Sequence, residues 1–408
     1  MKDVTIGIIG TAGFAEHHLN SLDAFAPEEK LVLSAACEVN PAFSDNLAKL
    51  AKKGVNAYTD CETMFKEEQG KLDFIIIPTS IQSHKPLAIS AMQNGFNVLL
   101  EKPPTTTIQD IDKIIETSKS TGQFCAVAFQ SVYNKDFRKI KELIASNTLG
   151  KLQSITGKLC WQRDFDYYSR NKWAGKTKVD NNWVMDGSIS NPGAHYLNNM
   201  LILGTCGDKE VSLEEINAEL YRANDIECED TVCLKSVLTN GITVNYNTTL
   251  GAEVNQSPLL VLHFENGKIE WEVQKKVIVK PTNDEEYSFA FDASEKFIQH
   301  AMYKNLLDHF RNGDEIKCDI SATRLFMLAI NGTYESAQRV DKIPSEYLIV
   351  YKNERDKTAI KIHNINSIID EAMQKGVLFS DLNVPWSKKK ETFELKDYKF
   401  FPEKFIGV

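Results

Sequence analysis

The sequence predicts an α/β protein in two parts: an N-terminal domain built on a parallel β-sheet, and a C-terminal α/β domain with an open, mostly antiparallel sheet. Two patterns carry this prediction. Up to about residue 128, short and nearly continuous apolar runs alternate with helical patterns, as expected for parallel strands buried on both faces. From about residue 150 to about residue 280, extended segments with alternating apolar and polar residues are joined by turn signals.

Runs of strand length recur through the first part, with helical patterns between them. One helix is expected to begin at Pro41, which suits a first helical position after Asn40. Another should run from about Ile108 to Ser120. This alternation indicates a parallel sheet covered by helices on both sides. The expected strands are Val4–Ile9, Leu31–Val39, one ending at Ile75–Ile77, one ending at Val98–Leu100, and Phe124–Phe129 as the last.

The second part begins with a different pattern. Residues from about Val211 to Lys280 indicate an antiparallel meander, with the pairs Asn240-Gly241 and Asn266-Gly267 suited to hairpin turns. We therefore predict a first domain at 1–128 and a second at 129–408, with a C-terminal extension from about residue 341. The other expected elements are helices at about Asp136–Ser146, Ser321–Val340 and Ile365–Lys375, and a strand at Lys151–Trp161.

Composition excludes several classes of protein. The chain has 408 residues and a net charge of -9, and its only lysine run is Lys388-Lys389-Lys390, which argues against nucleic acid or a membrane surface as a partner. We see no leader peptide and no apolar stretch of membrane-spanning length. The eight cysteines are scattered and form no C-x-x-C pair, and the histidines show no metal-ligand spacing. We expect reduced thiols, a cytoplasmic protein and no metal.

A glycine-containing turn follows the first expected strand. Small residues there give the tight turn and close backbone approach that a dinucleotide pyrophosphate needs, and the following helix offers free N–H groups and a positive dipole end. The turn indicates a Rossmann domain. Its residues are Gly10, Thr11, Ala12, Gly13, Phe14 and Ala15, with Ala12 in the usual position of the second glycine.

Glu38 ends the second expected strand, where an acidic residue can accept hydrogen bonds from the adenosine ribose hydroxyls. A carboxylate there would also repel the 2′-phosphate of NADP. No arginine or lysine occurs from Glu38 through Ala48 to bind that phosphate. NAD is therefore the favoured cofactor over NADP.

Two further segments point to chemistry. Glu101-Lys102-Pro103 follows a buried strand, and in open α/β sheets ligands bind beyond the carboxyl ends of strands. Lys102 could hydrogen-bond a substrate hydroxyl there, with Glu101 orienting it or contacting the cofactor. In the second segment Asn191 and His195 are four residues apart, which would place both on one helix face. A neutral His195 could take the proton of an alcohol as hydride leaves its carbon.

A third segment combines aromatic and polar side chains, the two kinds of contact by which proteins bind sugars. It supplies further candidates for substrate binding, alongside Asp186 in the stretch that precedes Asn191. These candidates are Trp161, Arg163, Tyr168 and Trp173.

These motifs together resemble the family of glucose–fructose oxidoreductases, inositol dehydrogenases and rhizopine-catabolism proteins (Gfo/Idh/MocA) over about residues 4 to 340. The resemblance implies NAD(P)-dependent oxidation or reduction of a sugar or cyclitol hydroxyl, with Lys102 and His195 as the catalytic pair. Family members commonly carry an aspartate where this chain has Asn191. The motifs that carry the resemblance are the glycine turn, Glu38, Pro78-Thr79 with His84, Glu101-Lys102-Pro103, and His195.

The sequence therefore predicts an NAD-dependent dehydrogenase acting on CH–OH groups of a sugar, cyclitol or sugar derivative. Pro78, Thr79, His84, Glu101 and Lys102 are expected to complete the cofactor site. An exposed sheet face predicts a homo-oligomer, a dimer or tetramer, because large apolar faces rarely stay bare. Two alternatives stay open: a glycosidase or lyase that retains NAD and oxidises the sugar transiently, and a non-catalytic redox sensor.

Overall fold

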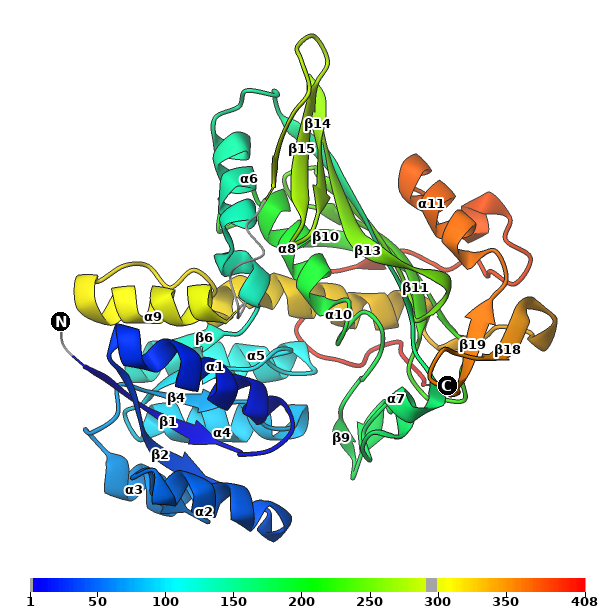
Figure 1. Cartoon of the computed structure of the whole chain (residues 1–408). Coiled ribbons are helices and arrows are strands. Elements are labelled where there is room, and N and C mark those ends of the chain that lie inside the picture. The colour runs from blue at the N-terminus through cyan, green and yellow to red at the C-terminus, as the bar shows by residue number, and fades with distance from the viewer. Residues whose placement is uncertain (1–2, 291–298, 408) are drawn as a thin grey trace. The chain divides into compact units, whose positions relative to one another are not determined.

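The computed structural model of the chain describes residues 3–290 and 299–407, and these form two compact units (Figure 1). Unit 1 comprises the described residues within Met1–Thr105, Gln109–Asn134 and Ser294–Arg324. Unit 2 comprises those within Thr106–Ile108, Lys135–Ala293 and Leu325–Val408. Each unit is described by itself below.

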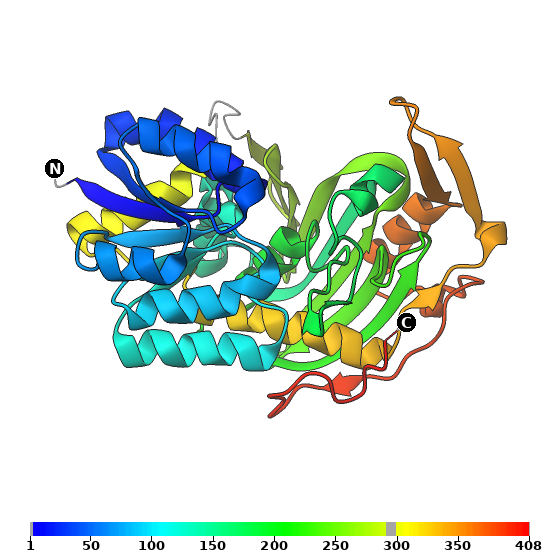
Figure 2. The ribbon, with the colours of Figure 1, turned by 90° about the horizontal axis from the view of Figure 1, so that it is seen from below.

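Unit 1 is built on a parallel six-stranded sheet with strand order β3-β2-β1-β4-β5-β6 and helices on both of its faces (Figure 2). The predicted parallel sheet is confirmed, and so is its last strand. The order changes direction between β1 and β4, which is where open α/β sheets bind ligands. The strands are β1 (Val4–Ile9), β2 (Leu31–Cys37), β3 (Asn56–Tyr58), β4 (Phe74–Ile77), β5 (Asn97–Leu100) and β6 (Cys125–Val127).

Burial explains which of these strands the sequence could predict. All four residues of β4 are buried, so its apolar run is continuous. Strand β3 was not predicted, because it has three residues and none of them is buried. The segment after Asn40 begins as a 3-10 turn, Pro41–Phe43, before α2 starts. The helices are α1 (Phe14–Glu29), α2 (Ser44–Lys52), α3 (Cys61–Glu68), α4 (Ile81–Gln93) and α5 (Ile108–Thr121).

Unit 1 also contains a segment that the predicted boundary at residues 128 and 129 assigned to the second domain. Helix α9 (His300–Asn312) belongs to this unit. Its aromatic side chains explain why: Phe310 stacks on Phe74 of β4 at 5.9 Å, and Tyr303 lies 5.9 Å from Phe25 of α1. The apolar face of α9 thus completes the core of unit 1, although the helix follows most of unit 2 in the sequence.

Unit 2 is built on a mixed ten-stranded sheet, with β16-β15-β14-β13-β7-β12-β11-β10-β17 as the main order. Most neighbours are antiparallel, as predicted, but β12 pairs β7 and β10 pairs β17 in parallel. The predicted continuous meander is wrong at one point, because β7 lies between β12 and β13. The strands of this order are β7 (Leu152–Gln162), β10 (Leu213–Arg222), β11 (Thr231–Leu238), β12 (Thr243–Thr249), β13 (Gly251–Phe264), β14 (Gly267–Glu272), β15 (Lys276–Pro281), β16 (Tyr287–Ala290) and β17 (Asp341–Lys342).

Helices cover both faces of this sheet, with α8 (Ala194–Gly204) on one side and α11 (Ile365–Lys375) on the other (Figure 1). Alternation along β7 shows both contacts. A Cβ added at Gly157 would lie 2.7 Å from Met200 of α8, whereas the neighbouring Lys158 pairs with Asp370 of α11. The remaining elements are α6 (Lys135–Ala145), α7 (Phe165–Ser169), α10 (Arg324–Ala337), β8 (Lys178–Val179), β9 (Asn182–Trp183), β18 (Leu348–Lys352), β19 (Thr358–Ile362) and β20 (Phe393–Glu394).

The predicted C-terminal extension packs on the α11 side of the sheet. Its buried side chains join Tyr221 and Cys233 of the sheet in one apolar cluster. Trp386 meets Tyr221 edge-on at 4.8 Å. The extension thus fills a face that the sequence analysis expected to be exposed. The extension residues of this cluster are Ile343, Ile360, Ile362, Ile365, Ile369, Ala372, Leu378, Phe379, Val384 and Trp386. None of the helices within the described residues is long and apolar enough to cross a membrane.

Candidate functional site

The loop after β1 has a backbone that glycine adopts far more readily than other residues. Gly10 has φ +97° and Gly13 has φ +63°, so a side chain at either position would be strained. The Gly10 N–H donates to the carbonyl oxygen of Cys37 at 2.8 Å, which holds the loop against the end of β2. Helix α1 begins at Phe14, and the buried Ala15 lets helix and strand pack closely. The loop therefore fits a dinucleotide pyrophosphate, as its sequence predicted.

Glu38 lies directly after β2, and only 8% of its surface is exposed. One carboxylate oxygen accepts hydrogen bonds from Thr11, from the backbone N at 2.8 Å and from Oγ1 at 2.9 Å. The other oxygen accepts from the Asn40 N–H at 2.9 Å. A carboxylate offers about four acceptor positions, so one remains for a ribose hydroxyl. Glu38 thus fixes the glycine loop and places its negative charge beside it.

His84 of α4 joins the segments that follow β4 and β5. One ring nitrogen lies 3.0 Å from the carbonyl oxygen of Thr79, and the other lies 2.9 Å from that of Pro103. Burial lowers the pKa of His84. Pro78 and Thr79 follow β4 directly, and a Cβ added at Gly10 would lie 3.4 Å from the Thr79 methyl group. Thr79 therefore lies next to the glycine loop, and the buried His84 holds the segments after β4 and β5 together.

Glu101, the residue after β5, is buried and orients the segment that carries Lys102. Its Oε2 accepts from the Lys102 backbone N at 2.9 Å, and its Oε1 lies 2.9 Å from His18 Nε2. His18 Nδ1 in turn lies 2.6 Å from the Tyr303 hydroxyl. Glu101 therefore holds the backbone at Lys102. The hydrogen bonds through His18 and Tyr303 in turn anchor Glu101 to α1 and α9. Lys102 itself is half-buried.

Sequence reasoning did not find His18 and Tyr303. Adjacent residues of a helix point in different directions, so the neighbouring pair His17 and His18 indicated no shared site. The contact of His18 with Glu101 spans 83 residues and its contact with Tyr303 spans 285. No local spacing in the sequence signals pairs so distant.

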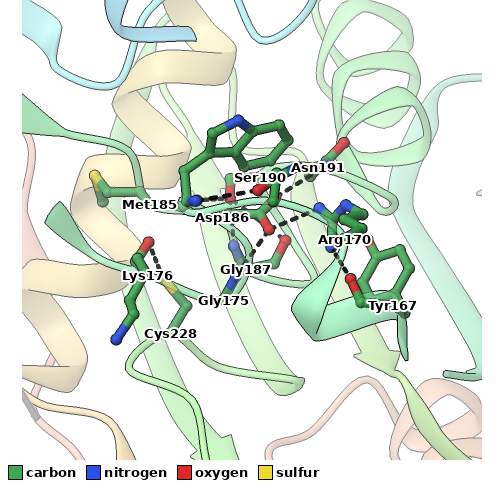
Figure 3. A network of polar contacts seen from close by, with 12 residues as sticks. Tyr167, Arg170, Gly175, Lys176, Met185, Asp186, Gly187, Ser190, Asn191 and Cys228 are labelled. Carbon is green, nitrogen blue, oxygen red and sulfur yellow. Dashed lines mark hydrogen bonds and ion pairs between the residues drawn. The ribbon is translucent and has the colours of Figure 1, made fainter. Parts of the chain in front are cut away.

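A second polar network lies in unit 2 and centres on Asp186, as Figure 3 shows. The Asp186 side chain is 4% exposed. Its Oδ2 accepts from Arg170 Nη2 at 2.8 Å and from the Gly175 N–H at 2.9 Å. Its Oδ1 accepts from Asn191 Nδ2 at 2.7 Å. Asp186, predicted as a substrate contact, thus orients Asn191 and Arg170.

The predicted placement of Asn191 and His195 on one helix face is wrong. Helix α8 begins at Ala194, so His195 lies in its first turn while Asn191 lies in the preceding turn. Pro192 explains the difference, because the residue before a proline is disfavoured in the helical region. Asn191 lies in the turn just before α8, and its side-chain amide is held by Asp186. Both Asn191 and His195 are partly exposed.

Aromatic rings and guanidinium groups alternate beside this network. The Arg163 guanidinium lies 4.9 Å from the centre of the Trp161 ring and 5.1 Å from that of Tyr167. Arg170 lies 4.0 Å from the Tyr167 ring and 5.0 Å from that of Trp173. Cation–π attraction holds such stacks together. The structure thus gathers Trp161, Arg163 and Trp173, three of the predicted substrate contacts, through Tyr167 of the same aromatic segment and through Arg170, which sequence reasoning missed.

Tyr168, also predicted as a substrate contact, meets the Tyr167 ring edge-on at 5.1 Å. Its hydroxyl is buried, and burial raises its pKa well above the usual range. A Cβ added at Gly175 would lie 3.5 Å from the Tyr168 ring. The ring packs beneath the loop that carries the Asp186 network, so Tyr168 supports this loop from inside.

Glu229 is a fully buried carboxyl group beneath the same loop. Its Oε1 accepts from the Ile189 N–H at 3.2 Å, and its Oε2 accepts a short hydrogen bond from the Tyr334 hydroxyl. Burial raises the pKa of Glu229 to about 7. A Cβ added at Gly187 would lie only 2.0 Å from its carboxylate. Sequence reasoning missed Glu229, because only the folded chain places it under Gly187.

Two family models match successive parts of the chain. The model described as "Oxidoreductase family, NAD-binding Rossmann fold" matches residues 4–129, and the GFO/IDH/MocA C-terminal domain model matches residues 137–270. Together they span more than half of the 408 residues. The chain therefore belongs to the Gfo/Idh/MocA family of NAD-binding oxidoreductases, as its motifs predicted. NAD is its cofactor, and the glycine loop with Glu38 fits that group.

Curated relatives include both dehydrogenases and glycosidases. A myo-inositol 2-dehydrogenase of Thermotoga maritima is 27% identical over 148 residues, covering 36% of this chain and 42% of the relative. A glycosyl hydrolase family 109 protein of Shewanella woodyi is 25% identical over 158 residues, covering 37% of this chain and 33% of the relative. The matched part of the chain thus spans less than half the length of these relatives.

Solved structures share most of the fold. The WlbA dehydrogenase from Bordetella pertussis, in complex with NADH and UDP-GlcNAcA, matches with a TM-score of 0.67 at 22% identity, over 83% of this chain and 97% of that one. A levoglucosan dehydrogenase in complex with NADH and levoglucosan matches with a TM-score of 0.68 at 15% identity, over 82% and 97%. At these identities the likeness shows the fold.

Proposed function

We propose that this protein is an NAD-dependent dehydrogenase that transfers hydride between nicotinamide and a CH–OH or keto group of a sugar, cyclitol or sugar derivative. The observation that carries the proposal is the position of Glu101-Lys102 at the carboxyl end of β5, in a sheet that belongs to an NAD-binding family. Ligands of such sheets bind at this edge. The buried hydrogen bonds that join Glu101, His18 and Tyr303 fix the backbone at Lys102.

Lys102 and His195 are the residues to which we assign proton transfer. A lysine ammonium can hydrogen-bond the hydroxyl oxygen and stabilise negative charge on it, and a neutral imidazole can take the hydroxyl proton as hydride leaves the carbon. Asn191, held by Asp186 at 2.7 Å, is a positioning residue that donates or accepts without exchanging the proton itself. NAD supplies the hydride acceptor when bound.

The stack of rings and guanidinium groups supports a carbohydrate-type substrate. Flat aromatic faces contact the C–H faces of sugars, and guanidinium donors hydrogen-bond hydroxyl and carboxylate oxygens. Trp161, Arg163 and Trp173 offer both kinds of group. The structural relatives named above hold UDP-GlcNAcA and levoglucosan, which are sugar derivatives.

The test is NADH formation, followed by absorbance, with NAD and a panel of sugars, polyols and sugar acids. Lys102→Ala and His195→Ala should each lower kcat about 10²- to 10⁴-fold, with NAD affinity within several-fold of the parent. Matched controls are Lys53→Ala in unit 1 and His363→Ala in unit 2, both exposed positions that should leave kcat unchanged. Full turnover by the His195 variant would remove the histidine from the mechanism.

A second candidate function is supported by the glycosyl hydrolase family 109 relative reported above. A glycosidase or lyase on this fold would oxidise the sugar transiently and acidify the neighbouring C–H. Reduced cofactor would then be reoxidised in every cycle. Glycoside cleavage with retained NAD and no net NADH would favour this function over the dehydrogenase.

We also propose a cytoplasmic location, because all eight cysteines are free thiols. Homo-oligomer formation stays a prediction. Its original argument was an exposed sheet face, and α11 with its neighbours occupies that face. A subunit contact would therefore use another surface.

A further inference from the structure

Two cysteines of unit 1 lie side by side where the NAD site is anchored. Cys37 is the last residue of β2 and is fully buried. Cys61 is the first residue of α3 and is partly exposed. Their sulfur atoms are 3.4 Å apart. A disulfide needs a separation of about 2.05 Å, so a small local movement would join them.

The two thiols have unequal reactivity. Cys61 begins α3, where free N–H groups and the helix dipole favour a thiolate. The contact with the Cys37 thiol lowers the pKa of Cys61, against the opposing effects of burial and of Asp60, Glu62 and Glu38. The same contact and burial raise the pKa of Cys37. Cys61 is therefore the nucleophile that an oxidant reaches, and Cys37 is the thiol behind it.

Cys37 is also bonded to the residues that shape the cofactor loop. Its carbonyl oxygen accepts the Gly10 N–H at 2.8 Å, and the next residue, Glu38, accepts both hydrogen bonds from Thr11. The Glu38 N–H donates to the Tyr58 carbonyl oxygen at 3.0 Å. Any movement of Cys37 toward α3 therefore shifts Gly10 and Glu38 together.

We propose that Cys37 and Cys61 form a reversible disulfide when the protein meets hydrogen peroxide, and that this disulfide weakens NAD binding. The Cys61 thiolate attacks one peroxide oxygen, giving a sulfenic acid and releasing hydroxide, which takes up a proton to become water. The Cys37 sulfur then attacks the Cys61 sulfur, and a second water leaves. Two thiols lose two electrons and two protons in all, and the peroxide O–O bond is reduced. A cytoplasmic disulfide of this kind would be transient and regulatory.

The proposal predicts two separate readouts. Titration of the reduced whole chain with hydrogen peroxide should give a peptide in which Cys37 and Cys61 are linked, with a mass loss of two hydrogens that dithiothreitol reverses. Calorimetric titration with NAD should show weaker binding by the oxidised protein, on the order of tenfold, because one hydrogen bond to a charged group is worth roughly that factor. Dithiothreitol should restore the original affinity.

Cys61→Ser is the test variant and Cys206→Ser is the matched control. Cys61→Ser should bind NAD like the reduced parent and keep that affinity after peroxide treatment. Cys206 is an exposed thiol of unit 2, so its loss should leave the peroxide response unchanged. Absence of the linked peptide, or equal NAD affinity before and after its formation, would overturn the proposal. Because the inference rests on NAD binding, a linked peptide in a protein that binds no NAD even when reduced would instead contradict the cofactor assignment.

Discussion

Replacing Glu229 with glutamine is expected to remove a pH-dependent loss of stability from unit 2. Burial raises the pKa of Glu229 from 4.5 to about 7. Because the folded state binds this proton more tightly than the unfolded chain, the stabilisation is complete below pH 4.5 and is lost as the pH rises through 7. At about 1.4 kcal/mol per tenfold change in proton affinity, the loss amounts to roughly 3 kcal/mol in the free energy of unfolding.

Urea unfolding followed by tryptophan fluorescence measures this loss, because all five tryptophans lie in unit 2. At about pH 4.5 Glu229→Gln and the parent should be similarly stable, whereas at about pH 8 the variant should be more stable by roughly 3 kcal/mol. Tyr334→Phe should extend the loss to higher pH, because the tyrosine hydrogen bond lowers the pKa of Glu229. Glu394→Gln, at an exposed position of unit 2, is the control. If the free energies of unfolding of Glu229→Gln and the parent differed by the same amount at both pH values, the conclusion that burial raises the pKa of Glu229 would be refuted.

Three further substitutions address the Asp186 network, the packing of Gly187 on Glu229, and the cofactor loop. Asp186→Asn should lower kcat roughly tenfold with little change in KM, because Asn191 loses its charged partner; steady-state kinetics on the substrate that the panel identifies measure both. Gly187→Ala should destabilise unit 2 by about 1–3 kcal/mol in urea unfolding, since its Cβ would meet Glu229, and an unchanged midpoint would contradict the packing. Glu38→Ala should narrow the difference between the dissociation constants of NAD and NADP; a wider difference would reverse the assigned role of its charge.

Local sequence patterns were sufficient for several of the regular elements of the fold. Val4–Ile9 and Ile365–Lys375 have the predicted bounds. A buried strand and an amphipathic helix each produce a characteristic pattern of apolar residues along the sequence, which can be recognised locally. The glycine loop was equally readable, since Gly10 and Gly13 adopt backbone angles that few other residues tolerate.

Contacts between distant residues were beyond the reach of such patterns. Glu229 packs directly against Gly187, yet no sequence pattern near either residue indicates this contact. The insertion of β7 between β12 and β13 likewise depends on pairing between segments about a hundred residues apart. The predicted placement of Asn191 on the helix of His195 was wrong for a local reason, because Pro192 disfavours the helical conformation at the residue before it.

The apolar cluster between the sheet of unit 2 and its C-terminal segment has a consequence for synthesis of the chain. Tyr221 and Cys233 leave the ribosome well before Phe379 and Trp386, which cover them in the finished fold. Until those later residues emerge, one side of the nascent sheet presents bare apolar surface, the kind of surface that makes partly folded chains associate. The interval between the synthesis of the strands and the synthesis of their cover is therefore a stage at which this apolar surface is open to association with other chains.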